Sequence, residues 1–197
     1  MKKLFLIVLY KSKIRDSQSC KSIVKNKLQT FSENHFLIWD NSPDKINTAS
    51  DCGIFFKTKN IDFHHTAQNI SLAKIYNYAF DEYSNFDAIQ IFDQDSEIQK
   101  DCYDDYLNEI IFKNQNIHVF LPKIFVNGRL YSPGKLKICR GHHFSDLPFG
   151  VNKHRFYTAI MSGTVVRPTF LKEHGIRFNE DLTLYCIDTD FFNKCRI

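Results

Sequence analysis

Asp93 and Asp95 follow directly after an apolar run, in the stretch AIQIFDQDSEI that spans residues 88–98. The apolar run predicts a buried strand, and the two aspartates stand where that strand would end. Carboxylates two residues apart in such a turn can hold one Mg²⁺ or Mn²⁺ ion, either directly or through water. A strand that ends in a solvated turn has the same pattern, so the rest of the sequence must decide between these interpretations.

Two further places carry candidate acids. Asp40 ends the stretch HFLIWDNS, where Asp and Asn are also common as turn-forming residues. Asp188 and Asp190 lie near the C-terminus in CIDTDFF, which is predicted to be helical from about Asp188. Helical residues two apart point about 200° away from each other, so these two acids cannot face the same group. Asp188 would also suit a plain helix N-cap.

The elements that must position these acids alternate along the chain. Apolar runs predict strands at 4–10, 36–40, 53–58, 88–92 and 117–126, and amphipathic spacing predicts helices at 18–31, 71–83 and 101–112. Such alternation with continuous apolar strands predicts an α/β fold, with a mostly parallel sheet and helices on both faces. Ligands bind beyond the carboxyl ends of such strands, so Asp40, Asp93 and Asp95 should share one rim. The stretch 128–155 lacks periodicity and predicts loops and short strands near that rim.

Composition narrows the class of protein. The chain has 197 residues, 43% of them hydrophobic, and a net charge of +4, which suits one globular domain over residues 1–197. The lysines are scattered and no arginine-rich run is present, so a nucleic-acid partner is not expected. Six dispersed cysteines without a C-x-x-C pair predict reduced thiols. No apolar run is long enough to cross a bilayer, so the chain should be soluble or peripheral. Reduced thiols suit a cytoplasmic protein, at most peripheral on the inner face of the cell membrane.

Taken in order, the segments WDNS, QNISLAKIYNYAF, FDQDS, MSGTVV and CIDTDFF resemble family 2 glycosyltransferases of the GT-A (Rossmann-like) fold. The similarity extends over nearly the whole chain and is greatest to the rhamnosyltransferase-like and galactofuranosyltransferase-like branch. The resemblance implies a dTDP-, UDP- or GDP-sugar as donor and Mg²⁺ or Mn²⁺ as cofactor. It also implies a surface-polysaccharide or lipid-linked glycan as acceptor, and inverting transfer.

The resemblance also implies a role for individual residues. Asp95 would ligate the metal, and Asp93 would contact the metal or the donor ribose. Asp40 would contact the nucleotide, and Asp188 would be the base that deprotonates the acceptor hydroxyl.

The remaining donor contacts are implied by less specific motifs. Asn69 and Asn77 match an N-x-G-x-x-x-A-x-N pattern at a helix facing the donor, although Ser71 stands where glycine is common. Asn77 could instead tie down a neighbouring loop. Gly163, after Ser162, would lie near the donor sugar, or it could simply allow a tight turn.

Basic side chains and histidines leave other options open. Four basic residues could assist the leaving diphosphate: Arg129, Lys135, Arg140 and Arg155. The irregular spacing of His142, His143 and His154 favours surface or acceptor-loop positions over a metal site.

Two alternative functions are also compatible with the sequence. Related enzymes continue well beyond their acidic motif, so we expect a chain truncated at its C-terminus, and a non-catalytic nucleotide-sugar-binding remnant is one rival. The other is a phosphatase of the haloacid dehalogenase type. Its D-x-D normally follows the first strand, whereas here the pair follows the fourth predicted strand.

Overall fold

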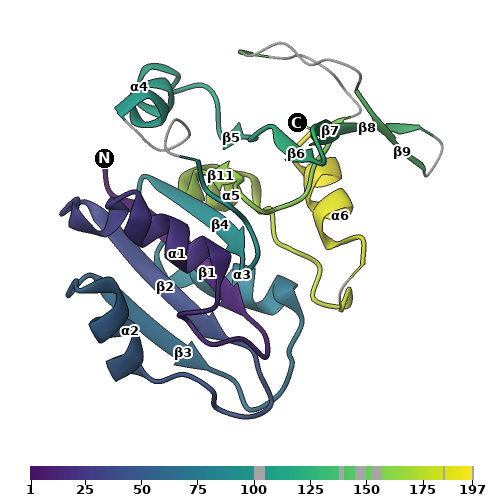
Figure 1. Cartoon of the computed structure of the whole chain (residues 1–197). Coiled ribbons are helices and arrows are strands. Elements are labelled where there is room, and N and C mark those ends of the chain that lie inside the picture. Colours follow the sequence, from purple (N-terminus) through teal and green to yellow (C-terminus); the bar gives the residue numbers. More distant parts are fainter. Residues whose placement is uncertain (100–104, 138–139, 145–149, 152–156, 184, 197) are drawn as a thin grey trace.

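Strand β1 (Lys3–Leu9) lies inside a six-stranded sheet of order β3-β2-β1-β4-β11-β5. This computed structural model describes residues 1–99, 105–137, 140–144, 150–151, 157–183 and 185–196. The neighbours of β1 are β2 (Asn34–Asp40) and β4 (Ala88–Asp93), both parallel to it, and β3 (Ile61–His65) is parallel to β2. The short strand β11 (Val165–Val166) runs antiparallel to β4 and to β5 (Val119–Phe120). The predicted mostly parallel sheet is confirmed (Figure 1).

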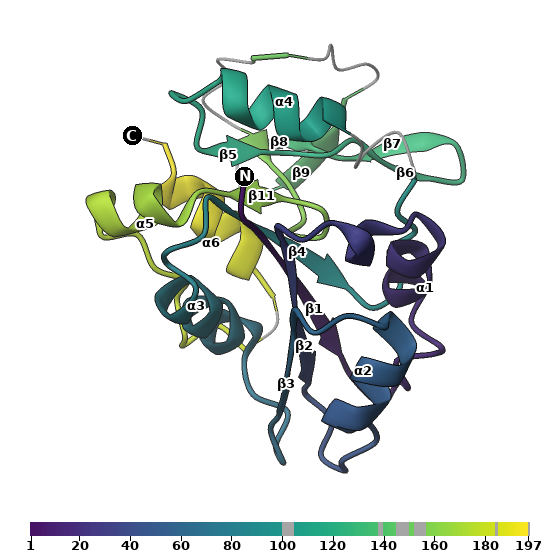
Figure 2. The ribbon, with the colours of Figure 1, turned by 90° about the vertical axis from the view of Figure 1, so that its left-hand side faces the viewer.

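Side chains of β1 alternate between the two faces of the sheet, as the strand period of two requires. Leu4, Leu6 and Val8 pack into the cluster that contains α3 (Leu72–Glu82), α5 (Pro168–His174) and α6 (Ile187–Lys194). The residues between them pack against α1 (Gln18–Lys25) and α2 (Ala49–Phe56) on the opposite face. Helices therefore cover both faces, as predicted (Figure 2). Helix α4 (Asp105–Lys113) lies near strand β11, because its Ile111 packs with Val165 of that strand.

The predicted strand at 53–58 is wrong, because residues 53–56 belong to helix α2 and Lys57 caps its C-terminus. Thr48 and Asp51 form a reciprocal capping box that begins the helix. Cys52 and Phe56, four residues apart, are 1% and 0% exposed, whereas Ile54 between them is 71% exposed. Burial therefore follows the helical period, and the third strand comes later, at β3.

The predicted strand at 117–126 is interrupted. β5 ends before Pro122, which cannot donate a backbone hydrogen bond to a ladder, and β6 (Ile124–Val126) joins a separate two-stranded sheet with β7 (Arg129–Ser132). A third sheet contains β8 (Gly134–Lys137), β9 (Arg140–His143) and β10 (Tyr157–Thr158). Loops and short strands were the prediction for this region, and its described residues confirm it.

The start of the helix predicted at 18–31 is confirmed, because Ser17 caps α1. Its end is wrong: α1 ends at Lys25, Lys27 adopts a left-handed conformation with φ 58°, and a short 3₁₀ turn (Leu28–Thr30) follows. Of the predicted helix at 101–112, residues 101–104 lie outside the described ranges. Among the cysteines, Cys20 and Cys52 are buried free thiols, and Cys102 and Cys139 also lie outside those ranges. No helix within the described part of the chain has the length and apolar character needed to cross a bilayer.

Candidate functional site

The turn after β4, Asp93-Gln94-Asp95, is fixed by the N-terminus of α1. The backbone carbonyl of Gln94 accepts hydrogen bonds from the Gln18 N–H (2.8 Å) and the Ser17 hydroxyl (2.8 Å). The Ser19 hydroxyl donates to the carbonyls of Asp93 and Ser96. All of these hydrogen bonds use backbone carbonyls of the turn as acceptors, so they do not involve the carboxylates of Asp93 and Asp95. This segment is called the acidic turn below.

A second segment, residues 159–164, contacts the acidic turn from the other side. The Ser162 hydroxyl accepts a hydrogen bond from the Asp93 backbone N–H (3.2 Å) and is also bonded to the Ser96 hydroxyl. The neighbouring Met161 N–H donates to the Asp188 carboxylate at 3.1 Å. Two consecutive residues of this segment, called the bridging turn below, therefore hold the acidic turn and Asp188 together.

Asp188 does not cap its helix, contrary to the alternative raised by the sequence. The N-cap of α6 is Cys186, which has a positive φ of 66° and makes no side-chain capping bond. Asp188 lies in the first turn of α6 and bonds to Met161, whereas Asp190 pairs with Lys194 at 2.7 Å. The two acids of α6 thus face different partners, as the helical geometry predicts.

The acids interact electrostatically across the sheet rim. Burial, with a smaller contribution from the charge of Asp95, raises the pKa of Asp93 from 3.8 to about 6. Burial also raises the pKa of Asp188 to about 6; the Met161 hydrogen bond opposes this shift and the charge of Asp93 adds to it. Tyr76 of α3 is affected by both acids, since burial and their two charges raise its pKa well above 10.0. Asp93 and Asp188 therefore lie close enough to interact electrostatically.

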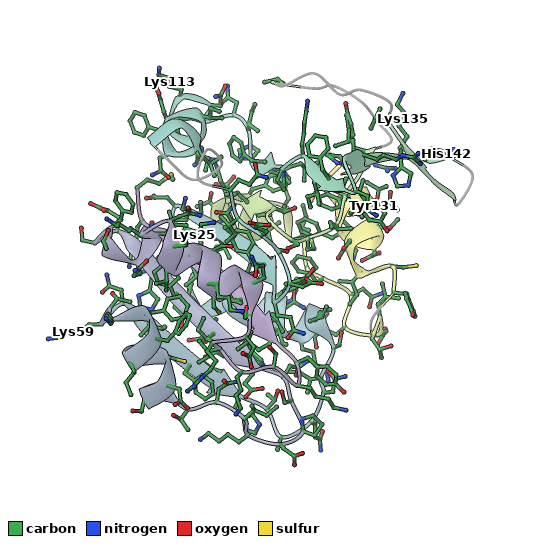
Figure 3. All side chains as sticks on the ribbon, in the orientation of Figure 1. Lys25, Lys59, Lys113, Tyr131, Lys135 and His142 are labelled. Atoms are coloured by element: carbon green, nitrogen blue, oxygen red, sulfur yellow. The ribbon has the colours of Figure 1, made fainter. Side chains whose placement is uncertain are left out.

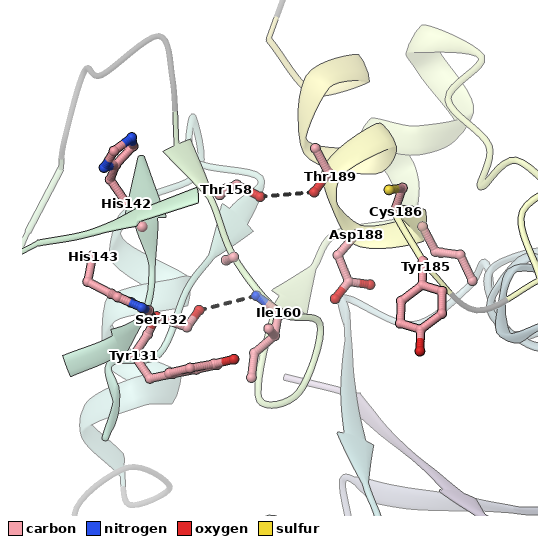
Figure 4. Close-up of a pocket in the computed structure, with 13 residues that line it drawn as sticks. Tyr131, Ser132, His142, His143, Thr158, Ile160, Tyr185, Cys186, Asp188 and Thr189 are labelled. Atoms are coloured by element: carbon pink, nitrogen blue, oxygen red, sulfur yellow. Dashed lines mark hydrogen bonds between the residues drawn. The ribbon is translucent and has the colours of Figure 1, made fainter. Parts of the chain in front are cut away.

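Asp188 opens into a pocket of about 460 Å³. Its walls come from β7, β8, β9, β10 and the start of α6, and Tyr131, Ser132, His143 and Tyr185 are among the residues that line it (Figure 4). The Ser132 hydroxyl accepts a hydrogen bond from the Ile160 N–H at 3.2 Å, which ties this wall to the bridging turn. This cavity is called the inner pocket. The pattern of acids did not predict Tyr131 or Tyr185 as part of it.

Asp40 is completely buried at the end of β2. Its carboxylate accepts hydrogen bonds from the Ser42 N–H (3.1 Å), the Asn47 N–H (3.2 Å) and the Asn47 side-chain amide (3.1 Å). These bonds close the turn that follows the strand. Because Asp40 pairs with Leu9 and Asp93 pairs with Val8, the two acids flank β1, about two strand spacings, or about 10 Å, apart.

Asn69 lies in the loop before α3 and is held by Asn41, a residue that the sequence reasoning missed. The Asn41 side-chain amide donates to the Asn69 Oδ1 (2.8 Å) and to the Ile70 carbonyl (2.9 Å). Its Oδ1 accepts from the Thr66 hydroxyl at 2.9 Å. The only signal for this role was its place in the DNS turn.

Asn77 binds a loop of the same chain. Its amide nitrogen donates to the Phe178 carbonyl (3.0 Å) and to Glu180 (2.8 Å), and its Oδ1 accepts from the Phe178 N–H (3.0 Å). The loop-tying interpretation of this asparagine therefore describes the observed contacts.

Gly163 occupies the bridging turn in a conformation that favours glycine. Its φ is +79°, and a Cβ atom there would lie 2.8 Å from Cγ of Pro122. Its N–H donates to the Ile91 carbonyl at 2.6 Å. The tight turn that the sequence allowed is thus present, and it lies beside the strand that delivers Asp93.

His142 and His143 both line the inner pocket, as Asp188 does. His143 bonds to the Tyr131 carbonyl at 3.1 Å. His154 and Arg155 lie outside the described residues. Within the described residues, no group of three or more His, Cys, Asp or Glu side chains is placed to hold a metal ion.

Comparison with known proteins identifies the fold. No family model and no curated protein matches the sequence, but solved structures resemble it. A crystal structure of TarS 1–349 from S. aureus matches with a TM-score of 0.61 and 18% identity, over 100% of this chain and 55% of that one. The same TarS segment with UDP matches over 98% and 54%, with a TM-score of 0.61 and 16% identity. GalNAc-T7 with UDP, GalNAc and Mn²⁺ has a TM-score of 0.68 and 13% identity, over 98% of this chain and 40% of that one.

The chain has the GT-A fold. It spans about half, or less, of the length of these proteins. At such low identities the similarity establishes the architecture, and the rhamnosyl or galactofuranosyl branch stays a prediction.

Proposed function

We propose that this chain transfers a sugar from a nucleotide-sugar donor to a glycan hydroxyl, with inversion at the anomeric carbon. The observation that carries the proposal is the arrangement of Asp93 and Asp188. One acid ends a sheet strand, the other faces the inner pocket, and the bridging turn contacts both. Donor and acceptor would then meet between two acids with different tasks.

Asp188 is proposed as the general base. The acceptor hydroxyl oxygen would bond to the anomeric carbon while the bond from that carbon to the diphosphate oxygen breaks. Asp188 would take the hydroxyl proton, and the nucleoside diphosphate would leave with the bonding electron pair. A raised pKa makes Asp188 a stronger base than an ordinary aspartate while it remains ionised at neutral pH.

The acidic turn has the properties required of a divalent-cation site. Asp93 and Asp95 are adjacent carboxylates whose mutual repulsion contributes to the raised pKa of Asp93, and a cation between them would relieve it. Two protein carboxylates leave other positions for water and donor phosphates, as is usual for Mg²⁺. Mn²⁺ in the GalNAc-T7 structure supports this assignment. When bound, the cation would neutralise charge on the departing diphosphate.

The other implied donor residues would act mainly by shaping the rim. Asp40 is enclosed, so we propose that it supports nucleotide binding through the turn it closes rather than by its carboxylate. Asn69, held by Asn41, would lie at the edge of the same turn. Asn77 would hold the 178–180 loop, and Gly163 would permit close approach of backbone to the donor sugar.

Calorimetry with UDP-, dTDP- and GDP-sugars, with and without Mn²⁺, tests the proposal first. The UDP complexes of TarS and GalNAc-T7 make UDP-sugars the first choice. We expect Mn²⁺-dependent binding, followed by release of nucleoside diphosphate when an acceptor is added. Binding without release by any acceptor would favour the non-catalytic remnant. Release of phosphate from simple esters, without any nucleotide-sugar binding, would favour the phosphatase.

A further inference from the structure

One wall of the inner pocket, which includes Tyr131, Ser132 and His143, comes from a stretch of chain whose charged residues are all basic. Residues 110–145 contain six Lys or Arg side chains and no Asp or Glu. The whole chain has 22 acidic residues in 197, so a stretch of this length without any acidic residue differs from the rest of the sequence. The proposed transfer reaction requires no such bias on the acceptor side, because the base is Asp188.

A second pocket adjoins the first and extends this basic surface. It has a volume of about 620 Å³ and shares Tyr131 and His143 with the inner pocket. Lys123 and Arg129 line it, and Arg129 is exposed. We call it the outer pocket. Among the lining residues that the structure describes in the two pockets, Asp188 is the single carboxylate.

Aromatic side chains lie along the same path. Tyr131 is 50% exposed at the junction of the two pockets, and Tyr185 is 81% exposed on the opposite wall of the inner pocket (Figure 4). Phe125, in the outer pocket, is 59% exposed. Exposed aromatic rings next to hydrogen-bonding groups suit ligands that have both apolar and polar faces, as sugar rings do.

We propose that the two pockets together bind an acceptor glycan that carries phosphate or carboxylate groups. The chain of sugars would run from Arg129 and Lys123 in the outer pocket, across Tyr131, to the reacting hydroxyl at Asp188. Lys123 and Arg129 give the outer pocket a positive charge, and a cleft lined by one sign of charge concentrates ligands of the opposite sign. Arginine binds carboxylate and phosphate through paired hydrogen bonds. The inference rests on the proposed function only in taking Asp188 as the point of reaction.

The test is fluorescence polarisation on the full chain with three labelled octasaccharides of equal length. One is an octagalacturonate, one a phosphorylated maltooctaose, and the third an uncharged maltooctaose. We expect at least one charged probe to bind about tenfold more tightly than the neutral one. Screening should reduce this advantage between about 50 and 200 mM salt.

Matched variants locate the effect. Arg129→Gln removes one exposed charge and should weaken binding of the preferred charged probe by about two- to fivefold, with neutral binding unchanged. Lys59→Gln removes the same charge from an exposed position far from Tyr131 and Lys135, and should change nothing (Figure 3). Tyr131→Ala should weaken charged and neutral probes alike.

Several results would overturn the inference. They are equal affinity for charged and neutral probes, equal losses in Arg129→Gln and Lys59→Gln, and Arg129-dependent binding only to phosphatidylglycerol vesicles. The last would identify the surface as a membrane contact. Nucleotide-sugar calorimetry separates the two proposals. Donor binding without charge preference refutes this inference alone, whereas charge preference without donor binding refutes the proposed function alone.

Discussion

The acidic turn and the start of α6 carry the two proposed chemical roles, yet they are held very differently. The Gln94 backbone carbonyl alone accepts hydrogen bonds from Ser17 and Gln18, and the Gln94 side chain accepts another from the Tyr10 N–H at 2.8 Å. The Asp188 carboxylate has the Met161 N–H as its described hydrogen-bond donor, and its helix begins at an uncapped Cys186. Several hydrogen bonds thus fix the acidic turn, where we propose the metal site, whereas few contacts fix Asp188, the proposed base.

The contrast follows from the strands that support each region. Asp93 ends a six-residue strand paired on both sides, whereas the inner pocket is built from strands of two to four residues. A long parallel sheet suits a donor site that must hold a charged diphosphate in one place. Short strands and loops suit a surface that accommodates varied acceptors.

The largest expected effect is on the base side. Asp188→Asn should lower turnover by about 10² to 10⁴, because general-base catalysis is typically worth this much. Affinity for nucleotide sugar should be unchanged, since the base acts on the acceptor. Steady-state kinetics with donor calorimetry checks both.

The matched control is Asp190→Asn, which removes the same charge from a side chain paired with Lys194. It should change turnover by less than about threefold, because the ion pair is partly exposed to solvent and such pairs contribute little. Equal losses in the two variants would refute Asp188 as the base.

On the metal side, Asp95→Asn should reduce Mn²⁺-dependent donor affinity by about tenfold or more, equivalent to about 1.4 kcal/mol. Asp95 is exposed, so its amidation should change stability by no more than about 0.5 kcal/mol. Donor titrations with Mn²⁺ and thermal melts measure the two quantities. Unchanged affinity would remove Asp95 from the metal site.

The pH dependence should report both regions together. Asp93 and Asp188 each have a pKa of about 6, so both lose ionisation as pH falls, and turnover should drop by at least about tenfold per pH unit below pH 6. A profile with its midpoint near pH 4 would contradict the burial of these acids.

Stability should respond to pH in the opposite direction. The native state holds the Asp188 proton more tightly than the unfolded state, so the free energy of unfolding falls as pH rises from about 4 to 6. Asp188→Asn avoids that loss. It should raise stability at pH 7 by about 1 to 3 kcal/mol, because folding raises the pKa of Asp188 from 3.8 to about 6 and one pKa unit corresponds to about 1.4 kcal/mol. Urea unfolding at pH 4.5 and 7 measures the difference, and a destabilised variant at pH 7 would contradict it.

The smallest predicted effect concerns the contact between the regions. Ser162→Ala removes a hydroxyl bonded to the Asp93 N–H and to Ser96, at a cost of about 1 kcal/mol. Turnover should fall by only about fivefold, because α1 still holds the acidic turn. The Mn²⁺ concentration needed for half-maximal turnover should rise. Ser12→Ala, whose hydroxyl bonds to Lys13 at the surface, is the control. A Mn²⁺ requirement that is the same in Ser162→Ala and Ser12→Ala would show that Ser162 does not position the metal site.

The sequence predicted the fold correctly where a continuous apolar run of strand length ends in a polar residue. The apolar runs of β1, β2 and β4 are buried on both faces, and their last residues, Asp40 and Asp93, could be placed on one rim. The prediction failed at 53–58, where two phenylalanines suggested a strand and the capping box of Thr48 decided for a helix.

The site itself was predicted only in part. Asp188 could be proposed, but its bond to the Met161 backbone N–H could not, because a backbone donor leaves no trace in residue type. Asn41 and Asn47 were missed for a related reason. Their partners lie 28 and 35 residues away in sequence, at Asn69 and Ser12, and only the folded chain brings them together.

The bridging turn has a consequence for how such proteins can diversify. Asp93 and Asp188 are 95 positions apart in sequence, yet consecutive residues 161 and 162 contact Asp188 and the acidic turn. The intervening chain forms β5 at the edge of the sheet, makes an excursion through β6 to β10, and returns to the sheet at β11, beside β4. Insertions, deletions or exchanges within that excursion can remodel the pocket walls without altering the spacing of the two acids. Acceptor choice could therefore drift quickly across generations while the reaction chemistry is inherited unchanged.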